Sequence, residues 1–233
     1  NLISGAEIAV STAADGFGSQ YLANNNQGVV WRSTAPTGQA ITMTYQSGGS
    51  PAATNVKGIV VMNHNLESGD TFLFEASNDA GFATKVDIAV PAGTGYVEVD
   101  WTYPYYRLSL SKTAGDYVQV GEIYLLGGAY EFQSNFKWNY SYTREINRNV
   151  KQTTSGQVYR RTRFVRRGFN MDFEGLTDTQ KLVFEDVAES DYICFLPYGS
   201  DGNLYYGVID FSSFTHVYND FWNVNLTFME NPK

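Results

Sequence analysis

The residues of this chain that could carry catalysis or bind a metal are few and scattered. His64 lies between two asparagines, and His216 lies in a segment rich in Phe and Tyr. A histidine metal site needs several ligands at suitable spacing, and no cluster of Cys or His accompanies either residue. No Gly-x-Ser-x-Gly turn, phosphate loop or dinucleotide fingerprint occurs. We therefore expect both histidines to be structural or surface residues, and we expect no bound metal or cofactor.

Carboxylates are the remaining candidates for hydrolytic chemistry. Asp79, Glu98 and Asp100 are candidates for the acid pair of a glycosidase. Acidic residues that alternate along strands usually lie on the solvated face, so we predict that the chain is not an enzyme and keep a hydrolase as an alternative. The single cysteine, Cys194, lies in an apolar run and is expected to be a small buried hydrophobic residue.

Charged residues form two opposite blocks in the second half of the chain. The first block has one acid, Glu145, and eight basic residues: Arg144, Arg148, Lys151, Arg160, Arg161, Arg163, Arg166 and Arg167. The second block has one basic residue, Lys181, and seven acids: Asp172, Glu174, Asp178, Glu185, Asp186, Glu189 and Asp191.

Three interpretations of these blocks stay open. The blocks neutralise each other within one copy, or the basic segment of one subunit meets the acidic helix of the next, which closes a ring when the rotation permits. The subunit interface would then consist of Arg144, Arg148, Arg160, Arg161, Arg163, Arg166 and Arg167 against Glu185, Asp186, Glu189 and Asp191. Nucleic-acid binding is the third, and the net charge of −8 argues against it. If subunits meet there, reversing the charge at Arg163 and Arg166 weakens assembly more than it unfolds the monomer.

The elements that must position these residues are mainly strands. In the first half, apolar and polar residues alternate in short segments separated by Gly, Asn, Ser and Pro, which is typical of a sandwich or jelly roll. The predicted strands are residues 56–62, 71–76, 85–90, 96–101, 105–110 and 119–126. Gly127 and Gly128 then mark a boundary, so we predict domains of residues 1–128 and 129–233.

The second half predicts a sheet with one packed helix. Its predicted strands are residues 132–142, 157–172, 192–196, 205–211 and 222–229, with a loop after the first. Thr177 and Gln180 match the capping box that starts a helix. Val183, Phe184 and Val187 supply its apolar stripe, and the helix is expected to end near Ser190.

Composition sets the remaining limits. A chain of 233 residues with 43% hydrophobic and 15% aromatic residues has room for two packed domains. No segment approaches the roughly 20 apolar residues of a membrane span, so no membrane insertion is expected. The start lacks the basic and apolar segments of a signal peptide. It begins at Asn1 without methionine, which leaves upstream residues open.

Several motifs of the first half resemble a known family. They include Val30-Trp31-Arg32-Ser33, Ile59 to Leu66, Phe74 to Asp79, Tyr106-Arg107-Leu108 and Val120 to Gly127. The series is similar to the discoidin-like, galactose-binding-type jelly rolls that occur in phage tail and baseplate proteins. These residues also predict that Trp31 fills the core and that Arg107 pairs with acids at the rim of the sandwich. The resemblance implies possible glycan recognition, with Trp101, Tyr103 and Tyr105 as candidate contacts; ordinary core and rim aromatics are the alternative.

The second half resembles the tail-tube or hub β domain of distal tail and tube proteins of long-tailed phages. The features are the two-stranded insertion at 132–172, the single helix and the terminal strand that ends at Glu230. The resemblance implies a structural virion protein at the tail tip, made in the host cytoplasm. It also implies a hexameric ring that links tail-tube to tip proteins. The alternative function for the chain is a carbohydrate-binding adhesion module that contributes to attachment to host surface glycans. Distal tail proteins usually place the hub domain first, and here the order is reversed.

Overall fold

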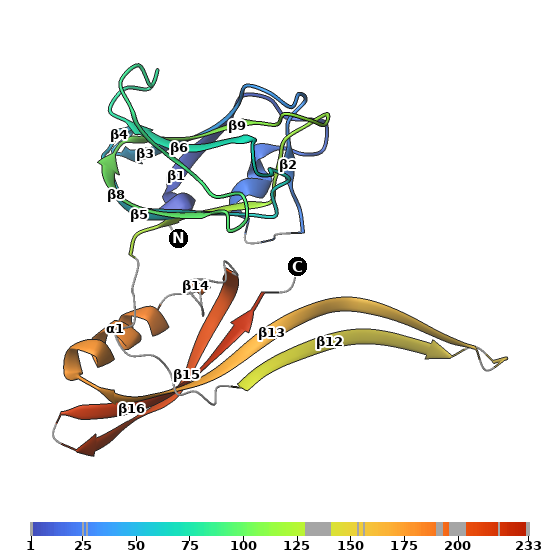
Figure 1. The fold of residues 1–233 in the computed structure, drawn as a ribbon, viewed down its shortest axis with the longest axis vertical. Helices are drawn as coiled ribbons and strands as arrows, with labels where there is room; N and C mark the ends of the chain where they lie inside the picture. The colour runs from blue at the N-terminus through green and yellow to red at the C-terminus, as the bar shows by residue number, and fades with distance from the viewer. Residues whose placement is uncertain are drawn as a thin grey trace. The chain divides into compact units, whose positions relative to one another are not determined.

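A computed structural model of the chain describes residues 2–24, 26, 28–128, 141–152, 154–155, 157–189, 193–195, 204–218 and 220–231. These residues form two separate units, one within residues 2–128 and the other within residues 141–231. Both units are built mainly from antiparallel strands (Figure 1). No helix among the described residues is long and apolar enough to cross a membrane.

The first unit is a β-sandwich, as the alternating pattern predicted. Its larger sheet has the order β1-β3-β9-β6-β7, with β4 beside β3, and its second sheet has the order β11-β5-β8, while β10 pairs with β2. The elements in chain order are η1 (Leu2–Gly5), β1 (Ala6–Val10), η2 (Ser19–Ala23), β2 (Trp31–Arg32), β3 (Gln39–Ser47), β4 (Ser50–Pro51), β5 (Thr54–Met62), β6 (Thr71–Ser77), β7 (Val86–Ala89), β8 (Tyr96–Tyr103), β9 (Tyr105–Ser111), β10 (Gln119–Val120) and β11 (Glu122–Leu126).

The core of the sandwich lies between the two sheets. Because side chains alternate across a pleated strand, every second residue of β3 is buried, including Ile41 and Met43. They belong to one cluster with Ile59 of β5 and Ile123 of β11, on the opposite sheet. Trp31 fills this core as expected: it is fully buried, and its indole Nε1 donates to the Thr12 carbonyl at 2.9 Å.

The second unit is a sheet of order β12-β13-β16-β15-β14 that packs against one helix, α1, among the described residues. Its elements are β12 (Ser141–Gln152), β13 (Val158–Leu176), α1 (Asp178–Ala188), β14 (Ile193–Phe195), β15 (Tyr205–Tyr218) and β16 (Phe221–Glu230). The capping box is confirmed, with Thr177 accepting from the Gln180 backbone and the Gln180 side chain accepting from the Thr177 backbone. Phe184 of α1 packs edge-on against Phe173 of the sheet, so α1 covers this side.

Several sequence predictions need correction. The loop predicted after residue 142 is wrong, because residues Ser141–Gln152 form β12. β13 and β15 extend beyond their predicted ends, and Gly121 separates β10 from β11 where one strand was expected. The strand predicted for residues 132–142 lies outside the described residues except for its last two positions. The strands β1, β2 and β3 were not predicted from the sequence.

Candidate functional site

The basic block of the sequence lies on a two-stranded arm. β12 pairs with β13 from Ser141 opposite Asn170 to Gln152 opposite Val158. The pairing of β13 with β16 starts at Gly168, so residues 158–167 pair only with β12 in the described chain. We call β12 together with residues 158–167 the arm, and Figure 1 shows it as a long, curved pair of strands.

The arm has two faces, and the cross-strand register assigns each residue to one of them, because residues opposite each other in a sheet share a face. The inner face continues the side of the sheet that carries buried Phe169 and that α1 covers. It consists of Tyr142, Arg144, Ile146, Arg148, Val150, Gln152, Val158, Arg160, Thr162, Val165 and Arg167. The outer face consists of Thr143, Glu145, Asn147, Asn149, Lys151, Tyr159, Arg161, Phe164 and Arg166.

A bulge at Arg163 decides which arginines reach the inner face. The register shifts between Asn147, which lies opposite Phe164, and Arg148, which lies opposite Thr162. The backbone of Arg163 is therefore the extra residue of the bulge. Beyond it Arg160 lies on the inner face and its neighbour Arg161 on the outer face. The side chain of Arg163 lies outside the described residues, so its predicted place in the interface stays a prediction.

Ion pairs within one copy use only part of the two charge blocks. Arg166 binds Glu145 at 2.5 Å across the outer face, and Arg167 approaches buried Glu230 at 3.7 Å. None of the ion pairs between described side chains joins the arm to α1. The described residues also offer no ion-pair partner to the four remaining predicted interface arginines, which are Arg144, Arg148, Arg160 and Arg161.

The inner face of the arm alternates these arginines with exposed apolar side chains. Val150 is 59% exposed, Val158 is 51% exposed and Ile146 is 37% exposed. Tyr142 packs its ring against Phe169 at 5.3 Å between centroids but stays half exposed. Burying an apolar side chain of this size stabilises a protein by about 1.5–3 kcal/mol, so this face is a favourable surface for a partner.

The acidic side of the predicted interface lies on α1. Asp178, Leu182, Glu185, Asp186 and Glu189 are three or four residues apart, which places them along one side of the helix. We call this set the acidic stripe. Leu182 is 59% exposed, whereas Phe184 and Val187 on the other side are buried. Glu185 pairs with Lys181 at 2.5 Å, and Asp178 accepts from the indole of Trp222 at 2.6 Å. Asp191 lies outside the described residues.

The three candidate glycan aromatics do not form one exposed platform. Trp101 stacks on the core residue Phe74 at 5.4 Å between ring centroids, and Tyr103 also packs against the core. Tyr105 lies on β9, where the buried residues alternate with it, so it faces away from the core. Their part in glycan contact stays a prediction.

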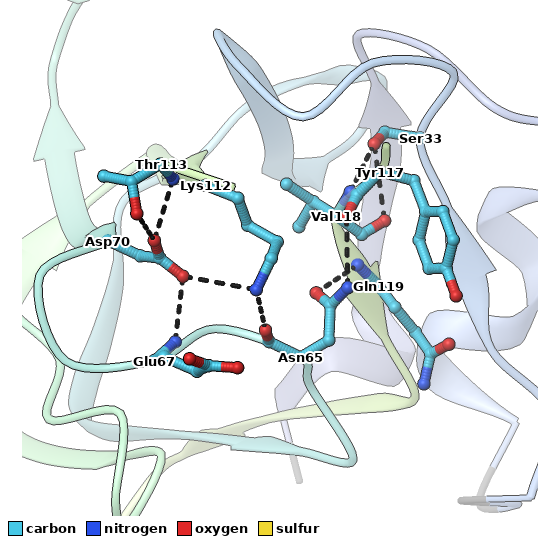
Figure 2. Close-up of polar contacts among 9 residues, drawn as sticks. All are labelled: Ser33, Asn65, Glu67, Asp70, Lys112, Thr113, Tyr117, Val118 and Gln119. Atoms are coloured by element: carbon cyan, nitrogen blue, oxygen red, sulfur yellow. Dashed lines mark hydrogen bonds and ion pairs between the residues drawn. The ribbon is translucent and has the colours of Figure 1, made fainter. Parts of the chain in front are cut away.

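A polar network ties two loops of the sandwich together, as Figure 2 shows. The carboxylate of Asp70 accepts from the backbone N–H groups of Thr113 and Glu67, both at 2.9 Å. Backbone hydrogen bonds from Thr113 and Glu67 hold the pKa of Asp70 well below its ordinary value, although burial acts in the opposite direction. The Lys112 ammonium bridges Asp70 and the Asn65 carbonyl, and the Asn65 side chain accepts from the Gln119 backbone. The network fixes the shape of both loops.

An arginine with two aromatic neighbours lies beside this network. The guanidinium of Arg32 lies over the rings of Phe17, at 4.4 Å, and Tyr117, at 4.9 Å. Its Nε donates to the Gln119 side chain at 3.0 Å. All four side chains are partly exposed. Planar donors flanked by aromatic rings suit ligands that present hydroxyl groups and apolar faces together.

His64, Asp79 and Asp100, which were considered for catalysis, each contact neighbouring residues of the sandwich. Burial and the charge of Lys112 lower the pKa of His64, although a backbone contact at Leu66 raises it, and its ring packs against Phe72. Asp79 accepts from the Ala83 backbone, and Asp100 pairs with Lys57 at 2.7 Å. No group of three or more His, Cys, Asp and Glu among the described residues is arranged to hold a metal. Burial raises the pKa of Cys194 to about 12.

No protein-family model matches the sequence, and the search of curated proteins gives no match. Among solved structures, the chain is similar to the lectin domain of lectinolysin complexed with Lewis B antigen, with 15% identity over 54% of this chain and 94% of that domain and a TM-score of 0.40. It is also similar to a pectin-binding carbohydrate-binding module, at 13% identity over 53% and 91% of the two chains, TM-score 0.39. A chitosan-binding module from Paenibacillus sp. IK-5 has 16% identity over 53% and 96%, with a TM-score of 0.41.

Sequence reasoning missed the Arg32 group and both faces of the arm. Phe17, Arg32 and Tyr117 lie far apart in the sequence, and no local pattern links them. The faces of the arm were missed because residues 143–152 were assigned to a loop. Ile146 and Val150 are an even number of residues apart in this polar segment, and this spacing could have indicated a strand with both side chains on one face.

Proposed function

We propose that this chain is a structural, self-assembling protein of a phage-type tail tip, which forms a ring that links the tail tube to tip proteins. One observation carries the proposal: the arm exposes alternating apolar and arginine side chains, and residues 158–167 of β13 pair only with β12 in the described chain. An isolated two-stranded ribbon is marginally stable in water, and contact with another subunit would stabilise it. Exposed apolar side chains gathered on one face of the ribbon, at Tyr142, Ile146, Val150 and Val158, favour an interaction site there.

The oligomeric state of the purified full chain tests this proposal. Sedimentation velocity and negative-stain images are expected to show a closed oligomer, and a hexamer fits the family that the second half resembles. The subunit should also occur in purified particles of its phage, at a copy number that matches the ring. A strictly monomeric chain at high concentration, absent from the particle, overturns the proposal.

A second function concerns the sandwich, and the group formed by Arg32, Phe17 and Tyr117 favours it. We propose that this unit binds carbohydrate and contributes to attachment to host glycans. Aromatic rings pack on the apolar faces of sugars, while the guanidinium and the Gln119 amide supply hydrogen bonds to hydroxyl groups. The loop network around Asp70 holds Gln119 in place through Asn65.

A glycan array tests this second function, with Lewis B, pectin and chitosan fragments as first probes because similar sandwiches are named for them. Arg32→Ala and Tyr117→Ala are expected to weaken a hit at least about tenfold. Trp101→Ala and Tyr105→Ala test the site predicted from the sequence in the same assay. An array without hits overturns carbohydrate binding, and a loss confined to Trp101 or Tyr105 moves the site to β8 and β9.

A further inference from the structure

The inner face of the arm carries positive charge without a negative residue of its own. Arg144, Arg148 and Arg160 lie on it between exposed apolar side chains, and its eleven residues include no acid. The single acid of the arm, Glu145, lies on the outer face and binds Arg166 there. A partner for the inner face must therefore offer carboxylates and at least one apolar side chain.

The acidic stripe of α1 offers both. It places the exposed side chain of Leu182 among four carboxylates along one side of a helix. An α-helix is straight and about 10 Å wide, which suits packing on the face of a two-stranded ribbon. The two surfaces are complementary in charge, and each carries at least one exposed apolar side chain.

The far end of the arm, at Arg148 and Arg160, and the acidic stripe of one copy are too far apart to meet along the sheet. α1 packs on β13 near Phe173, whereas Arg160 lies thirteen residues earlier on the same strand. At about 3.3 Å per residue, this separation is roughly 40 Å along the strand. The arm curves and has one bulge, at Arg163, but β12 stays paired with β13 on both sides of the bulge, so the arm extends away from the sheet.

We propose that the inner face of the arm docks on the acidic stripe of a second copy of this chain. The inference rests on the proposed self-assembly and identifies the surfaces that perform it. Because arm and stripe are different surfaces, the contact is head-to-tail, and an open chain of copies has one undocked arm at one end and one undocked stripe at the other. Such contacts continue until the ring closes.

Two adjacent arginines provide a matched test. Arg160 and Arg161 are both exposed arm residues, but Arg160 lies on the inner face and Arg161 on the outer face. Arg160→Glu is expected to weaken association of the full chain at least about tenfold by sedimentation equilibrium, and Arg161→Glu to change it less than about threefold. Thermal unfolding of both variants should match that of the native chain. Equal effects of the two substitutions on association overturn the inference.

A charge exchange tests the partner surface. Glu189→Arg in the acidic stripe should weaken association as Arg160→Glu does, whereas Asp210→Arg, an exposed control on the opposite side of the sheet, should not. Mixing the Arg160→Glu and Glu189→Arg chains should restore mixed assemblies. The native arm of one variant meets the native stripe of the other, and the two substituted surfaces, whose charges are both reversed, are again opposite in charge. Mixtures that stay dissociated, with folded chains, exclude the acidic stripe as the partner.

Assembly of the native chain and assembly of the variants test different statements. A native chain that never assembles contradicts the proposed function itself. A native chain that assembles, but whose assembly is unaffected by Arg160→Glu and Glu189→Arg, leaves the function standing and removes the inference. If Arg160→Glu instead abolishes salt-dependent binding of duplex DNA while assembly persists, the arm serves nucleic acid and the inference is wrong.

Discussion

The sandwich and the arm differ in how their charged side chains are paired. The sandwich buries Glu75, whose side chain is 1% exposed, and surrounds it with Arg107, Lys85 and Ser109. The arm leaves Arg144, Arg148 and Arg160 without an ion-pair partner among the described residues and exposes apolar side chains beside them. Internal pairing stabilises a unit that is complete by itself. Charge without an ion-pair partner among the described residues, beside exposed apolar side chains, is the basis on which we propose a partner for the arm.

The largest expected effect concerns the buried carboxylate of the sandwich. Burial raises the pKa of Glu75, but hydrogen bonds from Arg107, Lys85 and Ser109 outweigh it and hold the pKa below its ordinary value. Glu75→Ala removes the carboxylate that Arg107 and Lys85 share, although Lys85 keeps Asp87 at 3.7 Å, and is expected to lower the free energy of unfolding by about 3 kcal/mol. Chemical denaturation measures this loss. Glu98→Ala, at an exposed position of β8, is the control and should stay within about 0.5 kcal/mol.

A buried hydroxyl gives the next effect. The Tyr106 oxygen accepts from the Tyr103 backbone at 3.1 Å and lies 2.7 Å and 2.8 Å from the carbonyl oxygens of Thr54 and Trp101. Tyr106→Phe removes the hydrogen bonds of this hydroxyl to the backbone of the second sheet and should cost about 1–3 kcal/mol. Thermal denaturation of Tyr106→Phe and of the matched control Tyr105→Phe measures the difference. Equal stability of the two variants would contradict this role for the hydroxyl.

A smaller effect depends on pH. The folded-state pKa of Asp70 is depressed below its ordinary value of 3.8, so its carboxylate stabilises the folded sandwich above that pH. This stabilisation declines as the pH falls below 3.8 toward the folded-state pKa. Asp70→Asn should cost about 1 kcal/mol near neutral pH and flatten the loss of stability on acidification. Unfolding curves between neutral pH and pH values below 3.8 test this; an unchanged pH profile contradicts it.

The smallest effect on stability is expected in the arm. Val150→Thr removes apolar surface from a side chain that is already 59% exposed, so the monomer should change within about 0.5 kcal/mol. The same substitution at fully buried Val56 in the sandwich places a hydroxyl in the core and should cost about 1–3 kcal/mol. Association of the full chain should be weakened by Val150→Thr and left unchanged by Val56→Thr. A sandwich variant that weakens association while Val150→Thr does not would remove the contrast between the units.

The sequence predicted the sandwich better than the arm, for a physical reason. Period-two alternation identified β6, β7 and β8 because each of these strands has one face on the core. β12 has no buried face in this chain: its residues are exposed, except for Asn147 and Asn149, which are half-buried. Its alternation of apolar and basic residues carries no burial signal, so it was assigned to a loop. The charge reversal predicted to weaken assembly includes Arg166. In the structure Arg166 lies on the outer face and binds Glu145, so its reversal changes the outer face of the arm.

The sequence by itself determined the mainly β class, the capping box that starts α1 and the presence of two opposite charge blocks. Each of these depends on residues close together in the chain, whose types impose a local conformation or charge. Only the tertiary structure decided which arginines share a face, because the bulge at Arg163 exchanges the sides of Arg160 and Arg161. It also decided that Phe17, Arg32 and Tyr117 meet, since long-range strand pairing brings distant segments together.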